Sequence, residues 1–239
     1  MEENPRKANP EKIRNRLEKA LLIIVADISG SMEGEPINNV NEGISKMRNY
    51  ILNDSVLATQ FELAIITFHD HAEVYREFDL VMPEHEFERF TAGGRTNTLA
   101  AMNKAIEMAR ERKDKLKSEG IRYYRPMIAL LTDGQSTNSD KEIDDLDKRI
   151  QQEADNKGIH LLPFAIGDHA DLKELAKIAH VTGDAKPVVY KMDDMSKFGE
   201  LFVFLSASAG AAVAGGGEAA VPLDPSVAKP VVVNLDLTT

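Results

Sequence analysis

Three oxygen-bearing side chains at alternate positions, those of Asp27, Ser29 and Ser31, directly follow an uninterrupted apolar run at residues 21–25. Carboxylate and hydroxyl oxygens are hard ligands that suit Mg²⁺ and, with more latitude, Mn²⁺ or Ca²⁺. Gly30, between the two serines, permits a tight turn that can aim both hydroxyls at one point. The stretch is therefore a candidate metal site.

Two other segments carry donors of the same kind. Residues 93–98 read Gly-Gly-Arg-Thr-Asn-Thr before a predicted helix, and residues 130–134 read Leu-Leu-Thr-Asp-Gly at the end of an apolar run. Taken alone, each of the three motifs is more often a turn or a helix cap than a metal site. Ligands of open α/β sheets, however, bind at the carboxyl ends of the strands. The three segments together predict one site built from Asp27, Ser29, Ser31, Thr96 and Asp133.

Alternating apolar runs and amphipathic stretches predict the scaffold that positions these residues. Expected strands are residues 21–25, 61–69, 72–78, 126–132, 159–166 and 187–190, and expected helices are residues 36–52, 98–119, 140–156, 171–179 and 194–205. We expect Thr98 and Asp140 to cap their helices, and residues 80–95 to form a long surface loop. The pattern predicts an α/β fold with a doubly wound, mostly parallel sheet and helices on both faces. The three-residue gap at 69–71 requires a hairpin, and hence one antiparallel edge strand.

Composition changes at both ends of this region. Residues 1–20 form a charged extension in which residues 10–19 allow a short helix, and residues 21–206 form the globular domain. Residues 207–220 are nearly all Ala, Ser and Gly, which is typical of a flexible linker. Residues 231–237 have strand character, and we expect them either to add to the edge of a sheet, the protein's own or a partner's, or to be disordered.

Charge and cysteine content exclude several classes of protein. The 239 residues carry a formal net charge of -10, which argues against a nucleic-acid surface. The absence of cysteine excludes disulfides, thiolate metal sites and a cysteine nucleophile. The first residues do not resemble a signal peptide, and no apolar run approaches the length of a membrane span. A cytoplasmic protein that contacts neither nucleic acid nor membrane is expected.

Two further features lie near the predicted site. His69 and His71 have a spacing that can ligate a metal, but a solvated turn at the rim of the site is the favoured interpretation. Arg95, beside Thr96, could attract an acidic partner locally, although a single loop arginine is usually ordinary surface.

The D-x-S-x-S pattern of Asp27, Ser29 and Ser31, followed by Gly-Gly-Arg-Thr96 and Leu-Leu-Thr-Asp133-Gly, resembles the von Willebrand factor A (vWA) domain with its metal-ion-dependent adhesion site, MIDAS. The likeness covers residues 21–206 and includes the stretch 166–175. Residues 34–44 are similar to the bacterial TerY-like branch, which is associated with tellurium resistance and related stress systems.

The resemblance implies a Rossmann-like vWA fold in which three hydroxyls ligate Mg²⁺, or alternatively Mn²⁺ or Ca²⁺. Ser29, Ser31 and Thr96 would supply these hydroxyls, while Asp27 and Asp133 would act directly or through bound water. An Asp or Glu carboxylate of a partner protein would then complete the coordination of the metal.

The leading hypothesis is therefore a non-enzymatic protein-binding module, an adaptor or scaffold in a bacterial stress-response, tellurium-resistance or defence system. One alternative is a Mg²⁺-dependent phosphohydrolase that uses Asp27, although Ser29 stands where a haloacid-dehalogenase-like phosphatase would have a second Asp. No G-x-x-x-x-G-K-[ST] loop is present for nucleotide hydrolysis. Another alternative is the vWA subunit of an AAA ATPase or chelatase-type machine.

Overall fold

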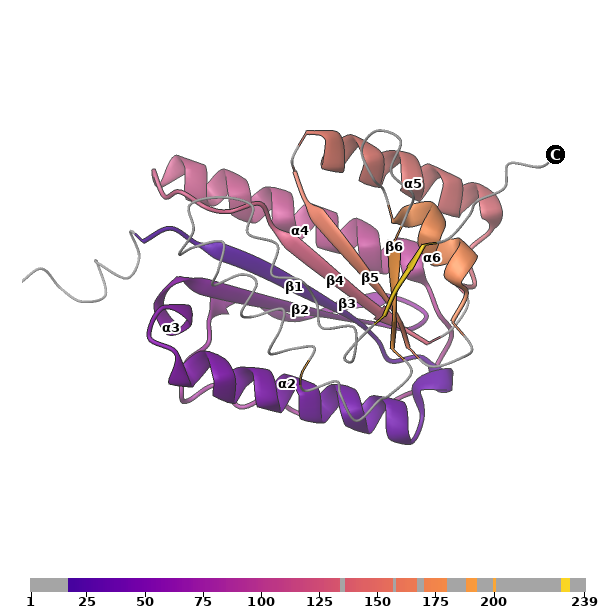
Figure 1. The fold of residues 1–239 in the computed structure, drawn as a ribbon, viewed down its shortest axis with the longest axis horizontal. Coiled ribbons are helices and arrows are strands. Elements are labelled where there is room, and N and C mark those ends of the chain that lie inside the picture. Colours follow the sequence, from indigo (N-terminus) through magenta and orange to yellow (C-terminus); the bar gives the residue numbers. More distant parts are fainter. Residues whose placement is uncertain are drawn as a thin grey trace, which may run out of the picture.

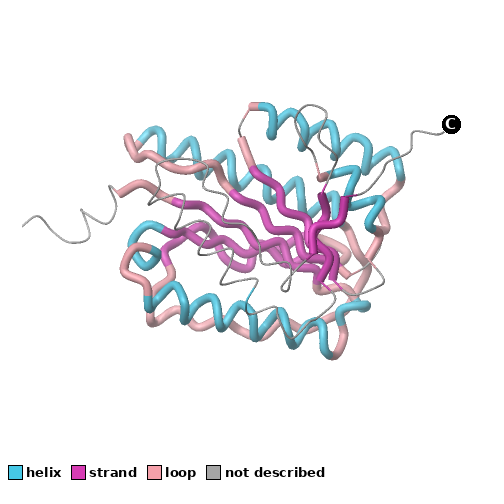
Figure 2. The backbone as a smooth tube through the Cα atoms, in the orientation of Figure 1, coloured by secondary structure: helices cyan, strands magenta, loops and turns pink. Residues whose placement is uncertain are grey.

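A seven-stranded sheet forms the centre of the computed structural model, which describes residues 17–133, 136–156, 158–166, 170–179, 188–192, 200 and 229–232. The strand order is β3-β2-β1-β4-β5-β6-β7. Figure 1 shows helices on both sides of this sheet, and Figure 2 shows the strands side by side between them. The predicted doubly wound α/β architecture is confirmed.

The strands are β1 (Ala20–Asp27), β2 (Phe61–Phe68), β3 (Ala72–Leu80), β4 (Met127–Thr132), β5 (His160–Ile166), β6 (Val188–Met192) and β7 (Lys229–Val232). Strands β1, β2, β4, β5 and β6 run parallel to their neighbours within this group. β3 pairs antiparallel with β2, as the short turn between them requires. Because the parallel strands share one direction, β1 and β4 deliver Asp27 and the residue after Thr132 to the same end of the sheet.

β1 lies in the middle of the sheet, and all eight of its residues are buried. Its alternate side chains contribute to two separate hydrophobic clusters, Leu22 and Ile24 to one and Ile23 and Val25 to the other. A strand with apolar contacts on both faces explains the uninterrupted apolar run in the sequence. The first polar side chain on this strand, Asp27, therefore stands where the core ends.

The helices are α2 (Glu35–Asn53), α3 (Leu57–Gln60), α4 (Thr98–Ser118), α5 (Asp140–Asp155) and α6 (Leu172–Ile178), with a short 3-10 turn, η1 (Gly30–Met32), after β1. α2 packs Val40, Ile44 and Met47 into one cluster, together with parts of the loop after β3. α4, α5 and α6 pack into the other cluster, on the opposite face of the sheet (Figure 1). Each buried helix face has the three- and four-residue spacing that the sequence shows.

Two helix caps lie one residue before the predicted positions. Asn97, and not Thr98, caps α4, because its Oδ1 accepts a hydrogen bond from the backbone N–H of Ala100. Ser139, and not Asp140, caps α5 through a capping box with Glu142. In both cases two adjacent residues are of capping type, and the side chain that reaches the free N–H groups of the first turn decides between them.

The far edge of the sheet differs from the sequence-based expectation. We expected residues 187–190 to form an edge strand, but β7 pairs antiparallel with β6, with Val189 opposite Val231. The C-terminal strand, residues 229–232, thus extends the protein's own sheet and includes residues 231 and 232 of the predicted segment 231–237, whose other residues lie outside the described part of the chain. Pro230 suits an outermost strand, since it has no N–H to offer a further neighbour.

The N-terminal helix expected at residues 10–19 does not reach Lys19, which forms an isolated parallel bridge with Tyr123. Residues 10–16, the helix predicted at 194–205 apart from residue 200, and the linker at 207–220 lie outside the described residues. Within the part of the chain that the structure describes, no helix has the length and apolar character needed to cross a membrane.

Candidate metal centre

Asp27 ends β1 as a fully buried carboxylate whose two oxygens are both hydrogen-bonded. Its Oδ1 accepts the backbone N–H of Ser29 at 2.8 Å, which folds the chain back on itself directly after the strand. Its Oδ2 accepts the hydroxyl of Thr132 at 2.6 Å from the end of the neighbouring strand β4. Asp27 therefore ties the loop after β1 to the end of β4.

Ser29, Ser31 and Asp133 meet beside Asp27. The two serine hydroxyl oxygens lie 3.1 Å apart, and the Ser31 hydroxyl donates to Oδ1 of Asp133 at 2.7 Å. The 3-10 turn η1 produces this approach, because it folds Ser31 back toward Ser29. Three of the predicted donors thus converge on one point from two segments more than one hundred residues apart in sequence.

Thr96 reaches the same region through the loop between β3 and α4. The N–H of Gly93 donates to the carbonyl of Ile28 at 2.8 Å, and the N–H of Gly30 donates to the carbonyl of Gly94 at 3.0 Å. These two bonds fix the Thr96 loop against the loop after β1. Thr96 is buried, and its carbonyl accepts the N–H and the hydroxyl of Thr137, which follows Asp133 in the chain.

In this loop, the backbone of Gly94 lies close to the side chains of Asp70 and His69. Its φ is +80°, and a Cβ there would lie 2.6 Å from Oδ2 of Asp70 and 2.9 Å from Nδ1 of His69. We expect Gly94→Ala to lower the free energy of unfolding by about 1–2 kcal/mol, because an L-residue is strained in this left-handed backbone region. Urea denaturation of the two proteins measures this difference.

Gly93→Ala is the matched control, since Gly93 has an ordinary φ and a Cβ there would meet no atom within 4 Å. We expect Gly93→Ala to change the free energy of unfolding by less than Gly94→Ala does. Equal losses in the two variants would contradict the role of the close approach.

The turn at residues 69–71 lies against this loop, as its predicted place at the rim of the site requires. The N–H of Asn97 donates to the carbonyl of His69 at 2.9 Å, and the Asn97 side chain donates to the carbonyl of Asp70. His71 is exposed and contacts Glu73. Among the described residues, no three or more His, Asp or Glu side chains are placed together to hold a metal ion.

The electrostatics of the centre fit a cation. Burial raises the pKa of the Asp27 carboxyl; hydrogen bonds from Ser29 and Thr132 oppose this rise, and the charge of Asp133 adds to it. A divalent cation close to both carboxylates would offset the cost of burying their charges. The oxygens of two serines and Asp133 are hard donors of the type that Mg²⁺ takes, so the residues present fit such an ion.

The structure therefore brings Asp27, Ser29, Ser31 and Asp133 into one hydrogen-bonded group and fixes the Thr96 loop against it. Arg95, the remaining candidate, is exposed. Sequence reasoning missed Thr132 as a partner of Asp27, because their contact depends on the register of β1 against β4. It also missed the polar residues Ser136, Thr137 and Asn138, for which the sequence offers no signal beyond their type.

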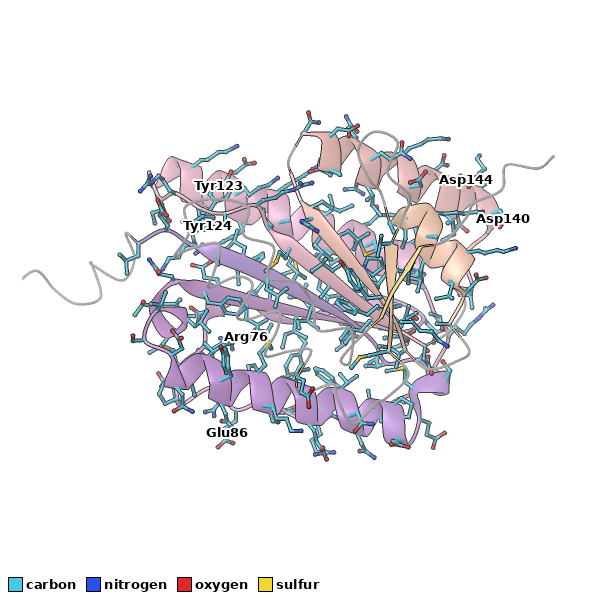
Figure 3. All side chains as sticks on the ribbon, in the orientation of Figure 1. Arg76, Glu86, Tyr123, Tyr124, Asp140 and Asp144 are labelled. Atoms are coloured by element: carbon cyan, nitrogen blue, oxygen red, sulfur yellow. The ribbon has the colours of Figure 1, made fainter. Side chains whose placement is uncertain are left out.

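Glu174 of α6 lies beside the loop after β4 and has a strongly raised pKa. Burial, and after it the charge of Asp171, raise its pKa to about 7, although a hydrogen bond from the backbone of Ser136 opposes the rise. Lys177 of the same helix lies 4.0 Å from Asp140 and 3.8 Å from Asp144, both at the start of α5 (Figure 3).

The folded state therefore holds more protons than the unfolded state between the ordinary pKa of Glu174, 4.5, and about 7. Stability conferred by the protonated form is lost as the pH rises through this window. We expect Glu174→Gln to be more stable than the wild type at pH 8, and the difference to vanish near pH 4. Thermal unfolding across this pH range measures it.

Glu142→Gln provides a contrast of opposite sign. The N–H of Ser139 lowers the pKa of Glu142, so its contribution to stability is present above its ordinary pKa and is lost as the pH falls. A Glu174→Gln variant that was less stable than the wild type at pH 8, as expected for Glu142→Gln, would contradict the assignment.

Comparison with known proteins gives one family and several structural neighbours. The sequence profile of the von Willebrand factor type A domain matches residues 22–203. No curated protein matches the sequence. Among solved structures, the ArnB paralog VWA2 from Sulfolobus acidocaldarius is similar over 79% of this chain and 45% of its own, with 20% identity and a TM-score of 0.53.

Proximal thread matrix protein 1 from the mussel byssus, in a structure with a zinc-occupied MIDAS motif, is similar over 81% of this chain and 48% of its own. The identity is 14% and the TM-score 0.55. The chain spans less than half the length of these two proteins, and at such identities the likeness concerns the fold.

Proposed function

Because the chain belongs to the von Willebrand factor type A domain family, we propose that it is a metal-dependent protein-binding module. In this proposal, Ser29, Ser31, Thr96, Asp27 and Asp133 hold a divalent cation, and an Asp or Glu side chain of a partner protein binds to it. The bound cation supplies an electrophilic position that attracts the partner's carboxylate.

The observation that carries the proposal is the convergence of donors from separate segments. Ser31 contacts Ser29 at 3.1 Å and Asp133 at 2.7 Å, at the carboxyl ends of two adjacent parallel strands. Mg²⁺ is the favoured ion because all these ligands are oxygens, and Mn²⁺ and Ca²⁺ accept the same set. The zinc in the mussel protein's MIDAS motif is a further reason to test several divalent metals.

The environment of Asp27 favours binding over hydrolysis of a phosphate ester. A nucleophilic carboxylate must reach the substrate, but Asp27 is fully buried and both its oxygens accept hydrogen bonds from the protein. This arrangement supports a structural and electrostatic role for Asp27. We therefore propose that the protein is not an enzyme.

The partner would belong to a bacterial stress-response, tellurium-resistance or defence system, with the protein acting as a cytoplasmic adaptor or scaffold. The similarity of residues 34–44 to the TerY-like branch motivates this assignment. These residues are Gly34, the N-cap of α2, and the first half of α2, and they begin three residues after the proposed ligand Ser31. An AAA ATPase is the alternative partner. The capture experiment below would identify it among the retained proteins.

Capture from a native lysate tests the proposal, with the full chain immobilised in Mg²⁺ or in EDTA. We expect a partner that is retained in Mg²⁺, released by EDTA and absent with Asp133→Ala. Asp145→Ala is the control, since Asp145 is exposed on α5 and pairs with Lys148. Capture that is unchanged by both EDTA and Asp133→Ala would overturn the proposal.

A further inference from the structure

Asn138 connects the loop that follows β4 with the loop that precedes α4. It contributes no ligand to the proposed metal site. Its Oδ1 accepts the backbone N–H of Leu99 at 3.0 Å, and its Nδ2 donates to Oδ1 of Asn97 at 3.2 Å. The orientation of this amide is fixed chemically, because the Leu99 N–H can only donate. Asn138 is therefore hydrogen-bonded to the N-cap and the first turn of α4, immediately after Thr96.

The same side chain also organises its own loop. Oδ1 of Asn138 accepts the hydroxyl of Ser136 at 2.7 Å, and the Asn138 N–H donates to that hydroxyl's oxygen at 3.1 Å. The Ser136 hydroxyl also lies 3.4 Å from the carbonyl of Thr96, but its single proton is better placed for Asn138. Thr137 then supplies the bonds that hold the Thr96 carbonyl.

These contacts form a clamp, by which we mean Asn138, Ser136 and Thr137 acting on Asn97 and Thr96. Asn97 is held from two sides, since its Oδ1 also accepts the N–H of Ala100 as the cap of α4. The clamp fixes the distance between the segment that carries Thr96 and the segment that follows Asp133. Residues that fix metal ligands in this way commonly change metal affinity 10- to 100-fold when they are mutated.

We propose that Asn138 is a positioning residue that holds Thr96 and Asp133 at the spacing a divalent cation requires. This inference rests on the proposed metal site and extends it to residues outside the ligand set. The clamp bonds Thr96 and Asn97 to the segment that begins three residues after Asp133. Loss of the clamp should therefore weaken metal binding even where the fold is intact.

Mn²⁺ titration followed by electron paramagnetic resonance tests the inference on the full chain. We expect Asn138→Ala to lower the affinity for Mn²⁺ by about 10-fold or more, in line with mutations of other groups that orient metal ligands. Asn156→Ala is the matched control, because Asn156 makes a similar side-chain bond to Gln152 at the opposite end of α5. We expect this control to bind Mn²⁺ like the wild type.

Ser136→Ala provides a second variant with a milder change, in case Asn138→Ala does not fold. It removes both bonds between the Ser136 hydroxyl and Asn138, while the bonds from Asn138 to Leu99 and Asn97 remain. We expect an intermediate loss of Mn²⁺ affinity, with unfolding temperatures in EDTA close to that of Asn156→Ala.

The outcomes separate the two claims. If the wild type binds Mn²⁺ and both Asn138→Ala and Ser136→Ala bind it equally well, the positioning role is wrong and the metal site stands. If the wild type itself binds no Mn²⁺, the proposed function and this inference both fail. If Asn156→Ala loses as much Mn²⁺ affinity as Asn138→Ala, the loss of affinity follows the loss of stability. This result also overturns the positioning role.

Discussion

Asp27→Asn is expected to abolish stabilisation by divalent metal while leaving the fold intact. The Asn carbonyl can still accept the N–H of Ser29, and its amide can donate to the hydroxyl of Thr132, so both contacts of the side chain survive. In EDTA the variant should be at least as stable as the wild type, because it replaces a buried carboxyl group whose pKa is raised by burial.

The wild type should gain about 2.7 kcal/mol of stability when free Mg²⁺ exceeds its dissociation constant 100-fold, and Asp27→Asn should gain almost none. Thermal unfolding in EDTA and in Mg²⁺ measures both values. Asp54→Asn is the matched control, because the Asp54 carboxylate also accepts two backbone N–H groups, those of Val56 and Leu57, but lies before the first residue of β2, at the opposite end of the sheet. A variant at Asp27 that keeps the full gain in Mg²⁺ would show that this carboxylate does not act on a metal.

Removal of one partner from the buried ion pair between Glu62 and Arg112 should produce the largest loss of stability. Glu62 lies on β2 with a side chain only 4% exposed, and Arg112 of α4 contacts both its oxygens, at 2.7 Å and 2.6 Å. Arg112→Met leaves a buried carboxylate without its cation. We expect a cost of about 3–5 kcal/mol, measured by urea denaturation at pH 7.

The double variant Glu62→Leu and Arg112→Met should recover most of this loss, because no uncompensated charge remains. Lys148→Ala is the surface control, since the pair of Lys148 with Asp145 is exposed and should contribute less than about 1 kcal/mol. Similar losses for Arg112→Met and Lys148→Ala would contradict the importance of burial.

The sheet could be predicted from the sequence because each central strand is apolar on both faces and each helix on one. The uninterrupted apolar run of β1 and the three- and four-residue spacing of apolar residues in α2 illustrate these two patterns. What could not be predicted depends on contacts between distant segments. The pairing of β7 with β6 depends on a register that no local pattern encodes, and the choice of Asn97 over Thr98 as a cap depends on which side chain reaches the helix start.

In the candidate site, too, residues in one short stretch could be predicted, and contacts between distant segments could not. Asp27, Ser29 and Ser31 could be identified because they lie in one short stretch directly after a strand. Thr132 could not be recognised as a partner of Asp27, because their contact depends on the register of β1 against β4. The clamp around Asn138 was missed for the same reason, since its contacts join residues about forty positions apart.

Counting bound Mn²⁺ ions by electron paramagnetic resonance tests most directly whether the three segments build one metal site. The account predicts one saturable ion per chain, displaced by Mg²⁺, and loss of that binding in the double variant Ser31→Ala and Thr96→Val. Thr59→Val, on α3, is the control and should bind like the wild type. Absence of saturable Mn²⁺ binding in the wild type, or its full retention in the double variant, would contradict the account.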